Sequence, residues 1–528
     1  MKCCIKLKSQ DFYQMKNKPL KLLIALLLLS ASTVGAFIYY QKKSEESERW
    51  NKMTFEERQA AIFTRQMKKA ENGDADAQSY LGFHYFWGSP SNETEGVKWY
   101  RKAAEQGQAS AQGMVGYAYL KGKGVDQDPQ QGINWLLKAA QQGDESSQKT
   151  LGDCYKFGNG VAVNEAEALK WYKLSADQNY GPAQISLGYC YFEGKGVDKN
   201  LAEGFRLWSL TANTDFAHQR EEAQYLVGWC LYYGKGVSRN QAEGIAWLKK
   251  SAERYNSDAA YELGLIYSSG EGVTKNEQEA NDWFMKSARG GNTNALNELG
   301  YRYSEGIGLI KDIDKAMAHY KAAAEKGNLG AQFNLGINHL GGKYGAEKSA
   351  DKAIYWFRKA AEKGHVRSQY WLGDCYLNGN GVISDPTQAF KWFLKSAESG
   401  DMFAQLKVGV CYANGTGVNK DEVEAVKWYR LSASQGVSTA QANLGYCYFK
   451  GQGVEKDEIE AYAYWNIAGA SNSYARENLS VIEKTMTPEA RLLAQQRTKR
   501  LKKEIEGKLE TIEDLKDAIQ NERRMKGA

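Results

Sequence analysis

The sequence predicts an all-α fold, a right-handed α/α superhelical solenoid of about eleven helix pairs. The main observation is the phrase Leu/Val-Gly-x-x-Tyr-x-x-Gly, with small variations, which returns at intervals of 34 to 40 residues, most often 36. A constant period of this length is typical of stacked two-helix units and not of separate globular domains. The first glycine of the phrase, called the anchor glycine below, is Gly82, Gly116, Gly152, Gly188, Gly228, Gly264, Gly300, Gly336, Gly373, Gly409 and Gly445.

Each unit begins with a short helix that carries the phrase. In the last unit this helix is expected over residues 440–448, where Ala440, Leu444 and Tyr448 are spaced by four and share one face. A glycine follows six residues after every anchor glycine, as at Gly451. Glycine adopts a positive φ without a Cβ clash, so this residue is predicted to end the helix.

A second helix follows a Gly-x-Gly-Val linker and is expected over residues 424–433 in the tenth unit. A tryptophan recurs within this helix in nine of the eleven units, with an alanine five residues later, as at Trp428 and Ala433. Small residues let two helices approach closely, and aromatic rings fill the remaining volume. We therefore expect the tryptophans to be core residues, with a ligand cage as the alternative.

These residues resemble the Sel-one-like repeat family, a relative of the tetratricopeptide repeats. The resemblance is carried by Ala-x-x-x-Leu-Gly-x-x-Tyr-x-x-Gly-x-Gly-Val followed by Ala-x-x-Trp-Tyr-x-x-Ala-Ala-x-x-Gly, over roughly residues 70–500. It implies a superhelix that binds other proteins, often as an adaptor for membrane-associated or secreted assemblies, and it implies no catalytic residues.

Both ends of the array depart from the repeat pattern, as terminal units of solenoids do. We expect a linker and an N-terminal capping helix within residues 41–73, the repeats over 74–473, and capping helices over 474–500. Thr487 and Pro488 are typical of the start of a helix. Residues 501–528 predict a charged amphipathic helix that is docked or solvated, and a dimerisation seam is the alternative.

The N-terminus predicts membrane targeting. Residues 1–21 carry six lysines, and residues 22–40 contain no charge and are long enough to cross a bilayer. The lysine excess predicts a single-pass anchor in an inner membrane, with the N-terminus cytoplasmic and the repeats periplasmic. The alternative is a cleaved signal peptide, with small residues at Val34-Gly35-Ala36 and a periplasmic or secreted product. Met15 is an alternative start to Met1.

Charge and cysteine positions argue against several kinds of ligand. Of the net charge of +6, residues 1–21 carry +5 and residues 497–528 carry +3, which leaves −2 for the rest and gives no basic stripe for nucleic acid. No cysteine or histidine pair has metal-ligand spacing, so we expect no metal and no cofactor. Six cysteines share one repeat position and are predicted to be small, unpaired, buried residues: Cys154, Cys190, Cys230, Cys375, Cys411 and Cys447.

The residue directly after the anchor glycine is the candidate partner-binding position, because it varies while the residues around it recur. By helical spacing it lies off the packing face, and we expect the first helices to line a concave groove. Aromatic residues are enriched in interface hot spots. The alternative is that these side chains fill volume between repeats. The aromatic members expected to bind a partner are Phe83, Tyr117, Tyr189, Trp229, Tyr301 and Tyr446.

The sequence thus predicts a non-enzymatic, membrane-anchored and exported scaffold, monomeric, that binds an unidentified protein partner through the groove. A secreted effector that binds a host protein is one alternative. A hydrolase acting on cell-wall or β-lactam substrates is another, and its sequence support is limited to short Ser-x-x-Lys matches at Ser146 and Ser349.

Overall fold

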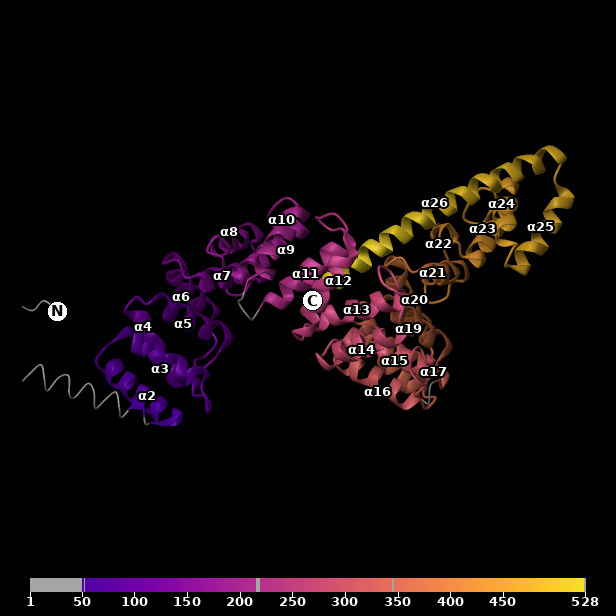
Figure 1. Cartoon of the computed structure of the whole chain (residues 1–528). Coiled ribbons are helices and arrows are strands. Elements are labelled where there is room, and N and C mark those ends of the chain that lie inside the picture. Colours follow the sequence, from indigo (N-terminus) through magenta and orange to yellow (C-terminus); the bar gives the residue numbers. More distant parts are fainter. Residues whose placement is uncertain (1–49, 52, 215–218, 344–345, 527–528) are drawn as a thin grey trace, which may run out of the picture. The chain divides into compact units, whose positions relative to one another are not determined.

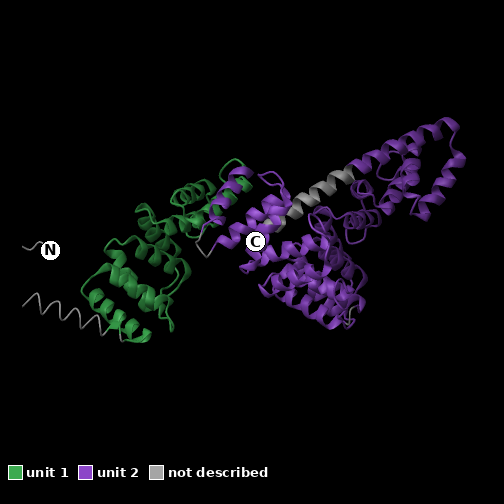
Figure 2. Ribbon diagram, in the orientation of Figure 1, with its two compact units in different colours: residues 1–200 green, residues 201–528 purple. Residues whose placement is uncertain are grey.

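The computed structural model describes residues 50–51, 53–214, 219–343 and 346–526, and for residues 508–526 it describes the backbone alone. In this part of the chain there are 25 helices and no strand (Figure 1). The chain divides into two compact units, residues 1–200 and residues 201–528 (Figure 2). The all-helical part of the sequence prediction is confirmed.

Unit 1 consists of antiparallel helices in which each described helix packs against the next along the chain. A repeat contributes a first helix, which carries the anchor glycine, and a second helix. The helices of this unit are α2 (Phe55–Glu71), α3 (Ala75–Trp87), α4 (Glu93–Glu105), α5 (Ala109–Lys121), α6 (Pro129–Gln141), α7 (Glu145–Phe157), α8 (Glu165–Ala176) and α9 (Gly181–Glu193).

Unit 2 continues the same pattern and ends in a longer helix that packs back on α24 and α22. Its helices are α10 (Leu201–Ala212), α11 (Arg220–Tyr233), α12 (Gln241–Glu253), α13 (Ser257–Ser269), α14 (Glu277–Arg289), α15 (Thr293–Glu305), α16 (Ile313–Glu325), α17 (Leu329–Gly341), α18 (Ala350–Ala361), α19 (Val366–Asn378), α20 (Pro386–Glu398), α21 (Met402–Asn414), α22 (Glu422–Ser434), α23 (Ser438–Lys450), α24 (Glu458–Ala468), α25 (Ser473–Thr485) and α26 (Pro488–Lys526).

The two glycines of the Gly-x-Gly linker have different roles. Gly451 ends α23 in the left-handed conformation, with φ 71°, as the sequence predicts. Gly453 also has a positive φ, and a Cβ atom on it would lie 2.0 Å from the carbonyl oxygen of Glu422, at the start of the preceding second helix. The second glycine therefore permits close contact between successive repeats. This contact, in addition to the geometry of the turn, accounts for a glycine at that position.

The residue that packs against the anchor glycine is not the recurring tryptophan but the residue after it. A Cβ atom on Gly264 would lie 2.5 Å from the ring of Phe284, which is fully buried, whereas the preceding Trp283 is half-buried. Trp465 departs from the other tryptophans: it packs against Gly445 and so occupies the position equivalent to Phe284. The prediction that the tryptophans are core residues is thus confirmed for Trp99 and Trp465, which are buried, whereas others, such as Trp135 and Trp356, are partly buried and pack against the core.

Most of the recurring tryptophans lie at the edge of the core and are covered by a lysine one turn later. The ammonium group of Lys102 lies 4.0 Å from the centre of the Trp99 ring, and that of Lys138 lies 4.4 Å from the Trp135 ring. Both are cation–π contacts between residues i and i+3 of one second helix. The indole is thus shielded from water without being fully enclosed.

Buried glutamines connect most of the first helices to the helix before them. The side-chain amide of Gln332, in α17, donates to the carbonyl oxygen of Ala324 near the end of α16, at 2.9 Å. The Ala324 carbonyl also accepts a hydrogen bond from the amide of Gly327, so the glutamine adds a second bond at the helix end. The same contact recurs at Gln78, Gln112, Gln148, Gln369, Gln405 and Gln441.

The ends of the array are closed by helices of their own. Thr54 and Glu57 form a capping box at the start of α2. At the other end, Thr487 accepts a hydrogen bond from the amide of Ala490, and α26 begins at Pro488. One continuous helix runs from there to Lys526, so the expected boundary at residue 501 does not exist; no proline or helix-ending glycine interrupts it.

The first part of α26 is docked on the array. Leu501 and Ile505 are buried against Ala463 of α24, and the guanidinium of Arg497 forms an ion pair with Glu460 at 2.5 Å. The predicted membrane segment, residues 22–40, lies outside the described residues. None of the described helices is both long and apolar enough to span a membrane.

Candidate functional site

In unit 1, the residue directly after the anchor glycine places aromatic rings at the surface of two neighbouring first helices, α3 and α5. Phe83 in α3 is 61% exposed, and Trp87, one turn further, is 48% exposed. The ring of Tyr117, from α5, is half-buried and lies 6.2 Å from the Trp87 ring. The ammonium of Lys123 lies 5.3 Å from the Trp87 ring. Within each unit, the surface of the first helices that carries the accessible residues after the anchor glycines is called the first-helix face.

Tyr189 and Trp229, the next two predicted residues, are less accessible. Tyr189 is half-buried in α9. Trp229 is 2% exposed, with its ring 5.1 Å from that of Tyr233. Every residue from Ala223 to Tyr232 in α11 is buried. The prediction that Trp229 contacts a partner is therefore corrected: the helix is enclosed on all sides, and Trp229 is a core residue.

In unit 2, Tyr301 of α15 is 48% exposed, and Tyr446 of α23 is half-buried at the rim of a cavity. The same position also carries aspartates that form ion pairs. Asp153 lies 2.7 Å from the ammonium of Lys149, and Asp374 lies 3.7 Å from Lys407. The residue after the anchor glycine is thus exposed aromatic in some repeats and charge-paired in others.

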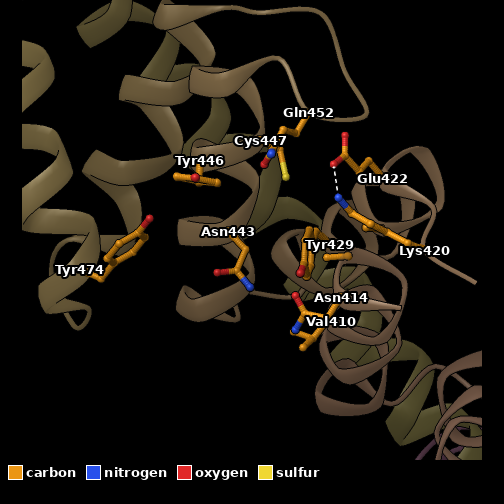
Figure 3. A pocket seen from close by; sticks show the side chains of 12 residues that line it. Val410, Asn414, Lys420, Glu422, Tyr429, Asn443, Tyr446, Cys447, Gln452 and Tyr474 are labelled. Atoms are coloured by element: carbon orange, nitrogen blue, oxygen red, sulfur yellow. Dashed lines mark ion pairs between the residues drawn. The ribbon is translucent and has the colours of Figure 1, made fainter. Parts of the chain in front are cut away.

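The cavity beside Tyr446 has a volume of 440 Å³ and lies on the first-helix face of the last two repeats (Figure 3). Its residues come from α21, α22 and α23, from the linkers that follow α21 and α23, and from α25, which contributes Tyr474. Burial raises the pKa of Tyr474, and the neighbouring Tyr446 raises it further. The lining consists of Val410, Ala413, Asn414, Lys420, Glu422, Ala425, Tyr429, Asn443, Tyr446, Cys447, Gln452 and Tyr474.

Sequence reasoning missed exposed aromatic residues of the first helices and of the capping helix α25, Phe403 of α21 among them. Trp87 and Phe157 stand five residues after an anchor glycine, and Tyr474 stands in the capping helix α25. A search of every first helix for aromatic residues at that fifth position would have found Trp87 and Phe157. Tyr474 has no such signal, because α25 lacks the anchor glycine.

The short Ser-x-x-Lys matches have structural explanations. Ser349 is the N-cap of α18, where its hydroxyl accepts a hydrogen bond from the amide of Lys352. The Lys352 ammonium lies 2.6 Å from Glu347, and that of Lys149 lies 2.7 Å from Asp153. Both lysines are thus ion-paired with carboxylates. Within the described residues, no group of three His, Cys, Asp or Glu side chains could hold a metal ion.

The six repeat cysteines are buried free thiols, as predicted. Burial raises the pKa of Cys154, Cys190 and Cys411 to about 11. A thiol with a raised pKa contains little of the thiolate that reacts with electrophiles or metals. These cysteines therefore act as small packing residues.

Comparison with known proteins agrees with this architecture. The pattern described as "Sel1 repeat" matches eleven consecutive segments: residues 75–108, 109–144, 147–180, 181–213, 221–256, 257–292, 293–328, 330–365, 366–401, 403–437 and 438–473. No curated protein sequence gives a significant match.

Two solved structures illustrate the likeness. One is a protective antigen of uropathogenic Escherichia coli with an SLR fold, which is 34% identical, with a TM-score of 0.54 over 86% of this chain and 97% of that one. The other is a Sel1 repeat protein of Oxalobacter formigenes, 28% identical, with a TM-score of 0.42 over 51% of this chain and 99% of that one. With eleven matched repeats over most of its length, the chain belongs to the Sel1 repeat family.

Proposed function

We propose that this protein is a non-enzymatic scaffold that binds a protein partner through its first-helix face. The observation that carries the proposal is that the first helices of both units bear accessible aromatic side chains: Phe83 in unit 1 is exposed, and in unit 2 Tyr301 is exposed and Tyr446 borders a cavity. Large aromatic residues give much contact area at a small loss of side-chain entropy, and they dominate many protein interfaces. Solenoids of this kind offer an extended surface for such contacts.

The proposal includes a membrane anchor over residues 22–40, with the repeats exported to the periplasm. Its support is the uncharged stretch of 19 residues behind six lysines. The similar E. coli protein is described as a protective antigen, and antibodies meet antigens outside the cytoplasm, which favours export.

A released protein is the second candidate. The small residues at Val34-Gly35-Ala36 suit a signal peptidase. Membrane fractionation and N-terminal sequencing of the mature chain separate the two. An intact membrane-bound N-terminus supports the anchor, and a new N-terminus near residue 37 in a soluble fraction supports release.

Partner binding is tested by affinity purification of the native chain with quantitative mass spectrometry. Phe83→Ala, Tyr301→Ala and Tyr446→Ala, combined in one protein, are expected to reduce partner recovery strongly. Tyr355→Ala is the matched control, because Tyr355 is 52% exposed but belongs to α18, a second helix. Full recovery of the partner with the triple variant would contradict the proposal. It would also be contradicted if the purified protein hydrolysed a β-lactam or cell-wall substrate and a single substitution abolished that activity.

A further inference from the structure

We propose that the cavity bordered by Tyr446 and Tyr474 binds an uncharged, extended peptide segment and accepts one large apolar or aromatic side chain of that segment. The inference rests on the proposed function, since it concerns the same first-helix face and specifies the chemistry of the partner. A volume of 440 Å³ is within the range of ligand pockets in proteins.

The cavity occupies a special place in the repeat array. After α23 and its second helix α24 comes the capping helix α25, which aligns with a first helix but has Ser480 where the repeats have an anchor glycine. Tyr474 of this helix and Tyr446 of α23 lie at one end of the cavity, and Val410 and Asn414 of α21 lie at the other (Figure 3). The last repeat thus presents a cavity whose rim is completed by the cap.

The charges in the lining are already paired. Lys420 and Glu422 are the two charged residues among the twelve that line the cavity, and their side chains form an ion pair at 2.8 Å. A charged ligand group would lose its hydration here without gaining an unpaired counter-charge. The lining is therefore complementary to an uncharged segment.

The uncharged polar groups of the lining suit a polypeptide backbone. Asn414, Asn443 and Gln452 carry side-chain amides, each of which can donate and accept hydrogen bonds. A peptide group also has one donor and one acceptor. The tyrosine rings offer apolar faces together with a hydroxyl group, which fits a side chain entering from a hydrated surface.

Apolar side chains continue from both ends of the cavity along the same helices. Phe403 stands seven residues before Val410 in α21, and Val481 stands seven residues after Tyr474 in α25, so each pair shares a helix face. Phe403 and Val481 are exposed. An extended segment whose large side chain enters the cavity would cover these residues on either side, which favours a peptide over a compact small molecule.

The test is saturation-transfer NMR on the full-length protein in detergent micelles. The probes are capped pentapeptides, acetyl-Ala-Ala-X-Ala-Ala-amide, with Trp, Phe, Leu, Glu or Lys at X, and maltopentaose represents a neutral glycan. We expect transfer to the Trp, Phe and Leu peptides and none to the Glu and Lys peptides. Tyr474→Ala and Val410→Glu are expected to weaken binding about tenfold or more, whereas Tyr355→Ala, in the second helix α18, leaves it unchanged.

Each outcome decides the proposal. The proposal is overturned if transfer to the charged peptides equals that to the Trp, Phe and Leu peptides, or if those three peptides show no transfer. It is also overturned if maltopentaose alone binds, or if Tyr474→Ala and Val410→Glu leave the transfer unchanged. Tyr474→Ala removes a side chain that is 44% exposed, so the variant is expected to fold, and circular dichroism checks this. If these probes fail while the triple variant above still loses its partner, the peptide pocket is wrong and the scaffold proposal stands.

Discussion

The guanidinium group of Arg302, only 1% exposed, lies 2.7 Å from the carboxylate of Glu277 and joins two successive repeats. Arg302 belongs to α15 and Glu277 to the start of α14, and Ser268 of α13 accepts a further hydrogen bond from Arg302 at 2.6 Å. Burial acts to raise the pKa of Glu277, but the hydrogen bond from Lys275 and the charge of Arg302 outweigh it and lower that pKa. The arrangement ties three helices through one buried cation.

Replacing Arg302 with Ala is expected to destabilise unit 2 by about 3 kcal/mol, because it leaves Glu277 and Ser268 without their buried partner. Urea unfolding followed by tryptophan fluorescence measures the change. Lys98→Ala is the control: its ion pair with Glu95 is exposed and is expected to contribute little. Equal midpoints for the Arg302 variant and the wild type would show that the buried pair does not stabilise the fold.

Gly264→Ala is expected to destabilise the protein by about 1–3 kcal/mol, since its new methyl group would lie 2.5 Å from the Phe284 ring in a packed core. Gly507→Ala in α26 is the matched control, as a Cβ there meets nothing within 4 Å. Alanine favours helix over glycine, so this control is expected to be neutral or slightly stabilising. Thermal unfolding compares the two. A Gly264→Ala protein as stable as wild type would refute the close-packing account of the anchor glycine.

His319 predicts a pH-dependent contribution to stability. Burial and the nearby Lys315 lower its pKa below 6.5, and its ring stacks on Tyr303. A histidine with a lowered folded-state pKa binds protons more readily when unfolded, so its contribution is complete above about pH 6.5 and is lost as the pH falls below that value. His319→Trp, which installs the residue of most other repeats, is expected to flatten the stability profile between about pH 7.5 and about pH 5.5. An unchanged profile would contradict this.

The repeat thiols are expected to resist alkylation in the folded protein. Burial raises the pKa of Cys375 to about 12 and of Cys447 to about 11. Maleimide labelling at about pH 8, read out by peptide mass spectrometry, should be slow at both until urea unfolds the chain. A cysteine introduced at Ile383, which is 92% exposed, should be labelled at once. Fast labelling of native Cys375 would show that the core opens readily.

The repeats and their helix ends were predictable because their signals are local. A cap residue or a glycine such as Gly451 determines the conformation of a single helix turn, and the same residues recur in eleven repeats, so each helix end could be placed from sequence. The burial of each aromatic side chain was harder to infer. The positions of Trp283 and Phe284 are both aromatic in many repeats, and the two side chains point about 100° apart around the helix axis. Only packing against Gly264 decides which one is enclosed.

Tertiary packing also explains the errors at the candidate site. Trp229 has the same sequence position as the exposed Tyr301, yet α11 is buried on all sides. Tyr474 lies outside the repeat pattern, and it lines the cavity beside Tyr446 because α25 packs against the last repeat. The burial of Trp229 and the position of Tyr474 depend on which helices pack together, and the repeat period of the sequence does not indicate this.

The central claim, that the first-helix face binds a protein partner, is tested most directly by photo-crosslinking in living cells. Benzoylphenylalanine is placed at Phe83, Tyr301, Tyr446 or, on a second helix, Tyr355, and crosslinked products are identified by mass spectrometry. The account predicts that the three first-helix positions capture a common protein and that Tyr355 does not. Crosslinks from Tyr355 alone, or none from any first-helix position, would contradict it.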